Sequence, residues 1–125
     1  MLIAIPTMDD RGLESEVSMH FGRAPFFTFV EVEDGEIRDV DVVRVPFEGH
    51  GPGDLPSFIR EHGGHVVIAY GMGPRAVEFF ERLGIKVVLG ASGKVGDVVR
   101  AYLGGDLRTD KGWREKGDFG DHDHM

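Results

Sequence analysis

The pattern of apolar positions in the first third of the chain predicts three β-strands. Residues 1–6 form an almost continuous apolar run, which is typical of a strand buried inside a sheet. Residues 26–33 are rich in aromatic and β-branched side chains, and residues 36–45 alternate acidic and apolar positions, so both segments favour strands. The dipeptide of Asp34 and Gly35 between them favours a tight turn. We therefore expect the second and third strands to form an antiparallel hairpin.

Beyond residue 46 the pattern changes to an alternation of helices and strands. Apolar residues recur three and four positions apart in three segments, and shorter apolar runs separate these segments. Asp54 is suited to cap the first helix, Pro74 to begin the second, and Gly84 to end it. The predicted helices cover residues 54–62, 75–83 and 95–103, and the predicted strands cover residues 65–70 and 85–89. The resulting order of elements is βββαβαβα.

This order predicts an α/β fold with a five-stranded mixed sheet between two layers of helices. If the third strand runs parallel to the first, four strands end at the same edge of the sheet. The loops at residues 7–23, 46–53, 71–74 and 90–93 then gather at that edge. In open α/β sheets ligands bind at such an edge. The sequence therefore predicts a binding site assembled from these loops.

Length and composition agree with one globular domain. The chain has 125 residues, of which 41% are hydrophobic and 29% are charged, and this is ordinary for a single folded domain. The apolar periodicity stops after residue 103. We therefore expect a folded domain over residues 1–105 and a polar, flexible, loosely packed tail over residues 106–125.

Charge and cysteine content narrow the classes of partner. The net charge is −8 and the basic residues are scattered, so no nucleic-acid partner is expected. No apolar run approaches the ~20 residues of a membrane span, and the start of the chain lacks the basic flank of a signal peptide. These features predict a cytoplasmic protein without a membrane partner. The absence of cysteine excludes disulfides, thiolate nucleophiles and thiolate metal ligands.

The most distinctive segment for chemistry follows the first predicted strand. It contains Met19, His20, Gly22 and Arg23. An imidazole, a guanidinium and a soft sulfur suit an anionic, metal-containing ligand, and a glycine permits close approach of the backbone. The alternative is that His20 caps a turn and Arg23 pairs with a nearby acid.

Two strand-to-helix turns offer a second set of binding groups. One contains Gly71 and Gly73 and is followed by Arg75, and the other contains Ser92 and Gly93. The start of a helix presents free backbone N–H groups and the positive end of the helix dipole, which favour anions. The first turn lacks the third glycine of a dinucleotide-binding motif. Both segments can equally be tight turns without a ligand.

The remaining histidines fall into two groups. His50 lies in a loop predicted at the binding edge, and His122 and His124 alternate with aspartates in the tail, so these three are candidate metal ligands. The alternatives are a solvated loop histidine and a frayed acidic tail. His62 and His65 flank a helix-to-strand turn at the opposite edge, where we expect structural roles.

No set of residues predicts catalysis. The first strand carries no carboxylate, and neither a Ser–His–Asp pattern nor a phosphate-binding loop is present. The expectation is a binding protein and not an enzyme. A binding module for a small organic anion or nucleotide and a small metal-dependent hydrolase are the alternatives.

Four segments resemble a known family. They are IAIP near the start, SMHFGRAPFF, GMGPRAVEFF and LGIKVVLGASG, and they occur in the same order over residues 1–105. These segments are similar to the dinitrogenase iron–molybdenum cofactor biosynthesis proteins, which include the NifX and NafY carriers and the C-terminal part of NifB. The resemblance implies a ribonuclease H-like fold and the binding or carriage of an iron–sulfur or iron–molybdenum-type cluster, without turnover.

The resemblance also implies roles for individual residues. His20 corresponds to the histidine of the family's HFG motif and is the expected cluster ligand, while Arg23 and the turn at residues 71–73 would neutralise cluster charge. Cluster-assembly or recipient proteins are the implied partners. Many relatives carry cysteine in these loops, and this chain has none. Stand-alone members occur outside nitrogen fixation, so the cargo need not be the nitrogenase cofactor.

Overall fold

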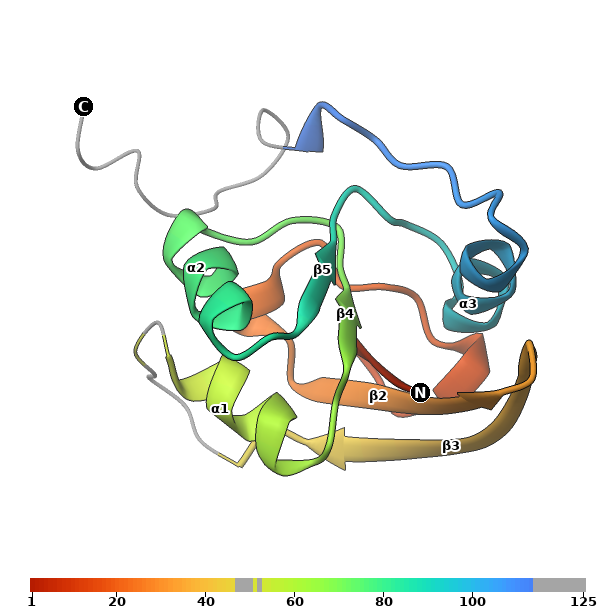
Figure 1. Ribbon diagram of the computed structural model, residues 1–125, viewed down its shortest axis with the longest axis horizontal. Coiled ribbons are helices and arrows are strands. Elements are labelled where there is room, and N and C mark those ends of the chain that lie inside the picture. Colours follow the sequence, from red (N-terminus) through yellow and green to blue (C-terminus); the bar gives the residue numbers. More distant parts are fainter. Residues whose placement is uncertain (47–50, 52, 114–125) are drawn as a thin grey trace.

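A computed structural model describes residues 1–46, 51 and 53–113, which form one mixed sheet covered by helices (Figure 1). The order of the strands across the sheet is β3-β2-β1-β4-β5. The strands are β1 (Leu2–Thr7), β2 (Phe26–Glu33), β3 (Glu36–Arg44), β4 (Val66–Ile68) and β5 (Lys86–Val88). The helices in the described part are α1 (Asp54–Glu61), α2 (Pro74–Arg82), α3 (Val95–Gly104) and the short 3-10 helices η1 (Gly12–Glu14) and η2 (Phe21–Arg23). The predicted five-stranded mixed sheet and the order βββαβαβα are confirmed.

The predicted hairpin between β2 and β3 is confirmed. Asp34 and Gly35 both have positive φ, 55° and 75°, which is the conformation that a tight two-residue turn requires. β2 pairs antiparallel with both β1 and β3, whereas β1, β4 and β5 run parallel to one another. β1, β3, β4 and β5 therefore all end at one edge of the sheet, which we call the carboxyl edge.

Each face of the sheet is closed by its own helices (Figure 1). Helices α1 and α2 cover one face, and α3 covers the other. β1 lies in the middle and sends side chains to both, with Ala4 on the side of α1 and α2, and Ile3 and Ile5 on the side of α3. These three residues are fully buried. The continuous apolar run of β1 follows from this position, because a central strand has no face in contact with water.

The start of α1 differs from the prediction by one residue. Asp54 is the first residue of the helix and Gly53 occupies the cap position. The Asp54 carboxylate instead accepts a hydrogen bond of 2.8 Å from the backbone N–H of Gly51. The side chain therefore orders the entry to the helix from inside its first turn.

The expectation of a loose tail from residue 106 does not hold for residues 106–113, which we call the strap (Figure 1, dark blue after α3). Leu107 and Trp113 pack against the core beneath α3. The backbone N–H of Asp110 donates to the carbonyl of Gly90 at 2.7 Å, and the Tyr70 hydroxyl donates to the Asp110 carboxylate at 3.0 Å. The strap is therefore fastened across the ends of β4 and β5. Residues 114–125 of the predicted tail lie outside the described residues.

The helices in the described part are short. The longest helix, α3, has 10 residues. No helix among the described residues is long and apolar enough to cross a bilayer.

Candidate functional site

Three of the four predicted loops meet at the carboxyl edge. The loop after β1 is joined to the loop between β5 and α3 by two backbone hydrogen bonds, from Val17 to Gly93 at 2.9 Å and from Val95 to Ser15 at 2.8 Å. These two hydrogen bonds make Glu16 and Lys94 an antiparallel β-bridge pair. The backbone therefore holds the predicted His20 loop and the Ser92–Gly93 turn in one fixed arrangement. His50, in the fourth loop, lies outside the described residues.

His20 is held at this edge by its neighbour in the sequence. His20 occupies the N-cap position of η2 without a side-chain cap hydrogen bond. The next residue, Phe21, is buried with its ring edge-on to Phe80 of α2 at 5.7 Å and to Phe27 of β2 at 5.5 Å. Phe21 belongs to the same buried cluster as Met72, which lies between the two glycines of the β4–α2 turn. The packing therefore places η2, which follows His20, against α2, the helix that begins after that turn. Nδ1 of His20 is buried, and the residue as a whole is half-buried.

Ser18 organises the His20 loop, and the sequence analysis did not identify it. Its side chain is buried, and its backbone N–H donates to the carbonyl of Pro6 at the end of β1. The hydroxyl accepts the His20 backbone N–H at 3.1 Å and lies 3.1 Å from the His20 carbonyl. A serine two residues before a histidine in a glycine-rich loop is the local signal, since serine often bonds to the backbone two positions on.

The other predicted groups of the first loop lie on its surface. Met19, Gly22 and Arg23 are all exposed. Arg23 is the last residue of η2, one turn from His20. The loop thus presents an exposed thioether, a partly buried imidazole and an exposed guanidinium from residues 19, 20 and 23.

The β4–α2 turn presents a helix start. Gly71 is buried and Gly73 occupies the cap position of α2, followed by Pro74 as the first helical residue. Among the described residues no side chain caps this helix start. Arg75 is exposed in the first turn. Backbone N–H groups at such a start, with a cation beside them, favour an anionic ligand.

The β5–α3 loop is shaped by its glycines. Gly90 and Gly93 have φ of +89° and +102°, which L side chains rarely adopt. Ser92 and Gly93 are exposed at the turn. Lys94 next to them is already paired with Glu14 at 3.0 Å, and this hydrogen bond and charge hold the pKa of Glu14 below its usual range. Arg23 and Arg75 are exposed cations that follow His20 and the β4–α2 turn in the sequence.

The carboxylate of Asp9 is hydrogen-bonded to two other side chains of the first loop. The Ser15 hydroxyl donates to its carboxylate, and Arg11 Nε donates to the other oxygen at 3.0 Å. The hydrogen bond from Ser15 and then the Arg11 interaction lower the pKa of Asp9. This carboxylate stabilises the loop fold and is a poor choice for a metal ligand.

Metal-ligating side chains do not cluster in the described chain. Within those residues, no group of three or more histidines and carboxylates lies close enough to hold an ion. His62 and His65 lie at the opposite edge, as predicted, where His62 stacks on Phe29 at 5.2 Å and His65 Nδ1 accepts the Leu2 backbone N–H at 3.0 Å. His122 and His124 lie outside the described residues. His20 is the imidazole at the carboxyl edge of the described part.

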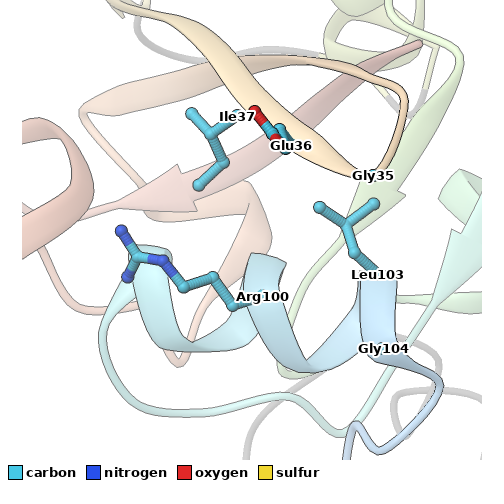
Figure 2. Close-up of a pocket in the computed structure, with 6 residues that line it drawn as sticks. All are labelled: Gly35, Glu36, Ile37, Arg100, Leu103 and Gly104. Atoms are coloured by element: carbon cyan, nitrogen blue, oxygen red, sulfur yellow. The ribbon is translucent and has the colours of Figure 1, made fainter.

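A separate cavity of about 480 Å³ lies at the opposite edge (Figure 2). It separates the β2–β3 turn from the end of α3, and its walls include Ile37 and Leu103 with Arg100 to one side. β2 runs antiparallel to β1, so the turn after β2 is remote from the carboxyl edge. This cavity is therefore not part of the candidate site.

These observations define a small α/β domain with a loop-built binding edge, and comparison with known proteins identifies its family. The family model for dinitrogenase iron-molybdenum cofactor proteins matches residues 1–105. The chain belongs to the dinitrogenase iron-molybdenum cofactor family, as its resemblance to that family had implied.

Individual relatives are similar to this chain over most of its length. The chain is 32% identical over 110 residues to the uncharacterised protein MJ0580 of Methanocaldococcus jannaschii, a match that covers 86% of this chain and 89% of the relative. The crystal structure of PH0822 is similar, with 51% identity, a TM-score of 0.85 and coverage of 90% of this chain and 99% of that one. The Thermotoga protein TM1290, provisionally assigned as a NifB protein, has 30% identity, a TM-score of 0.68 and coverage of 86% and 91%.

Proposed function

We propose that the protein is a non-catalytic accessory protein that carries an iron–sulfur-type metallocluster at its carboxyl edge. The observation that carries this proposal is the position of His20, which is fixed by buried Ser18 on one side and buried Phe21 on the other, at the edge where three loops meet. Family membership supports a role in the handling of such a cofactor. The strand order β3-β2-β1-β4-β5, with only β2 antiparallel, supports the ribonuclease H-like assignment.

The cluster is cargo and supplies its own metal and sulfide framework. The chain contributes an imidazole from His20, which is an adequate ligand for iron when neutral. Arg23 and Arg75, both exposed, offset the negative charge of the cluster. The backbone of the turns at Gly73 and Gly93 allows close approach of the cargo. A carrier of this kind passes its cargo to an assembly or recipient protein, so the site faces outward.

The second candidate function is the binding of a small organic anion or nucleotide. It is favoured by the start of α2, which no described side chain caps, and by the adjacent Arg75. Both functions use the same turns, but only the cluster requires His20. Substitution of His20 therefore separates them.

The direct test is anaerobic incubation of the protein with ferrous iron and sulfide, followed by gel filtration and visible spectroscopy. The wild type is expected to elute with a charge-transfer band. His20→Ala is expected to lose at least ten-fold of that absorbance per protein, with a thermal midpoint within about 2 °C of wild type, because a partly exposed loop residue contributes little to the core. His62→Ala, which removes an imidazole from the opposite edge, is the control and should retain the band.

Two outcomes would contradict the proposal. A wild-type protein that binds organic phosphates but acquires no charge-transfer band supports the second candidate. A His20→Ala protein that unfolds many degrees below wild type shows that His20 is a structural residue of the loop.

A further inference from the structure

Two exposed methionines accompany His20 in the loop after β1. The exposed large apolar side chains of the described chain are Met1, Met8 and Met19, at 44%, 61% and 43% exposure. Met1 lies at the start of β1, at the far edge, while the other two lie on either side of Ser18 in the His20 loop. A thioether exposed to this degree adds little to the core and is accessible to a ligand.

Met8 and His20 meet at a single buried group, the Ser18 hydroxyl. This hydroxyl accepts the backbone N–H of His20 at 3.1 Å, and its one proton faces both the His20 carbonyl at 3.1 Å and Met8 Sδ at 3.4 Å. Ser18 is 1% exposed and is itself tied to the end of β1 through its bond to Pro6. The sulfur of Met8 and the backbone of His20 therefore lie against the same hydroxyl, although they are twelve positions apart in the chain.

The chemistry of this pair suits a soft metal centre. A thioether is a soft, neutral donor, and an imidazole is a donor of intermediate character. The chain has no cysteine, so thioether sulfur is the only side-chain sulfur that it can offer. We propose that Met8 is a second side-chain contact for the metal centre bound at His20, and that Ser18 is the positioning residue that joins the two. This inference rests on the proposed function for the identity of the cargo, but the donor pair can be tested without it.

The test uses protein labelled with ¹³C in the methionine methyl groups and titrated with Ag(I), a soft ion that thioether and imidazole groups bind. Met8→Leu and Met19→Leu assign the two loop resonances. Met72, which is buried, and Met1, which is exposed at the far edge, serve as internal controls. The Met8 methyl and the His20 ring resonances are expected to shift together within the first equivalent of Ag(I), before Met1 responds.

Substitutions then test whether the two donors form one site. Met8→Leu should weaken the Ag(I) response of His20 at least ten-fold, and His20→Ala should do the same to Met8. Ser18→Ala keeps both donors but removes the hydroxyl that joins them. The Met8 and His20 resonances of this variant are therefore expected to respond at different Ag(I) concentrations. A parallel response of Met8 and Met1, a response of Met19 in place of Met8, or a His20 response that Met8→Leu leaves unchanged would each overturn the inference.

The same labelled protein distinguishes failure of this inference from failure of the proposed function. If iron and sulfide give the charge-transfer band while the Met8 methyl does not move, the carrier function stands and Met8 is not a contact. If Ag(I) couples Met8 to His20 but no band forms, the donor pair stands and the proposed cargo is wrong.

Discussion

Substitution of Gly90 by alanine provides a severe test of the contact between the strap and the binding edge. Gly90 has φ of +89°, and a Cβ atom built there would lie 2.7 Å from the carbonyl oxygen and 2.8 Å from the nitrogen of Asp110. Real Cβ atoms essentially never approach other atoms so closely. The obstruction is backbone and not a flexible side-chain tip, so the strap must move away.

The cost can be built from two contributions. An L-residue with positive φ is strained by about 1–2 kcal/mol. Displacement of the strap also removes the hydrogen bond from Asp110 to Gly90 and the one from Tyr70 to Asp110, each worth about 1 kcal/mol. The expected destabilisation of Gly90→Ala is therefore about 3–4 kcal/mol. At roughly 4 °C per kcal/mol for a chain of this size, the thermal midpoint should fall by about 12–16 °C.

Gly84 provides the matched control for this substitution. It has φ of +75°, but nothing lies within 4 Å of a Cβ atom built on it. Gly84→Ala therefore carries the strain alone, about 1–2 kcal/mol. Both variants are measured by thermal unfolding and by the fluorescence of Trp113. This residue is the single tryptophan of the chain, belongs to the strap and packs against the core.

The fluorescence separates the two causes of destabilisation. Gly90→Ala should shift the Trp113 emission toward that of solvated tryptophan under native conditions, and Gly84→Ala should leave it unchanged. Equal losses of stability in the two variants, with wild-type emission in both, would refute the reasoning. The strap would then not be fastened at Gly90.

Two further predictions concern the first loop and the core. The pKa of Asp9 is lowered in the folded protein, so its stabilising effect is present above the ordinary carboxyl range and is lost as the pH falls through the lowered value. The thermal midpoint of Asp9→Asn should therefore lie below that of wild type at pH 7, and the two should converge toward pH 2; a constant difference across this range would contradict the role of the carboxylate. Phe80→Ala removes a fully buried ring from α2 and should cost about 3–5 kcal/mol in urea unfolding, whereas a loss below 1 kcal/mol would mean that Phe80 does not anchor η2 to α2.

The sequence was sufficient for the parts of the fold that local chemistry determines. The hairpin at Asp34 and Gly35 was predictable because the two residues are suited to positive φ. The apolar run of β1 revealed a central strand because only such a strand is buried on both faces. The direction of the parallel strands then followed from the short helical crossovers, and with it the edge at which the loops gather.

The interior of the candidate site could not be predicted in the same way. The alignment of Met8 with His20 depends on Ser18, whose position is fixed by bonds to Pro6 and by the pairing of its loop with residues 93–95. These are contacts between distant parts of the chain and leave no periodic signal. The packing of the strap was missed for the same reason, since its polar composition concealed the roles of Asp110 and Trp113.

Because of the strap, the folded structure extends beyond the residues that the family model matches. The family model ends at residue 105, yet Asp110 lies beyond that point and satisfies Tyr70 and Gly90 within it. A chain cut at the family boundary would leave the buried Tyr70 hydroxyl and the Gly90 carbonyl to water at the ends of β4 and β5. Residues 106–113 are thus an integral part of the cooperative structure in this protein. Sequence families of this kind can mark where homology ends without marking where a domain is complete.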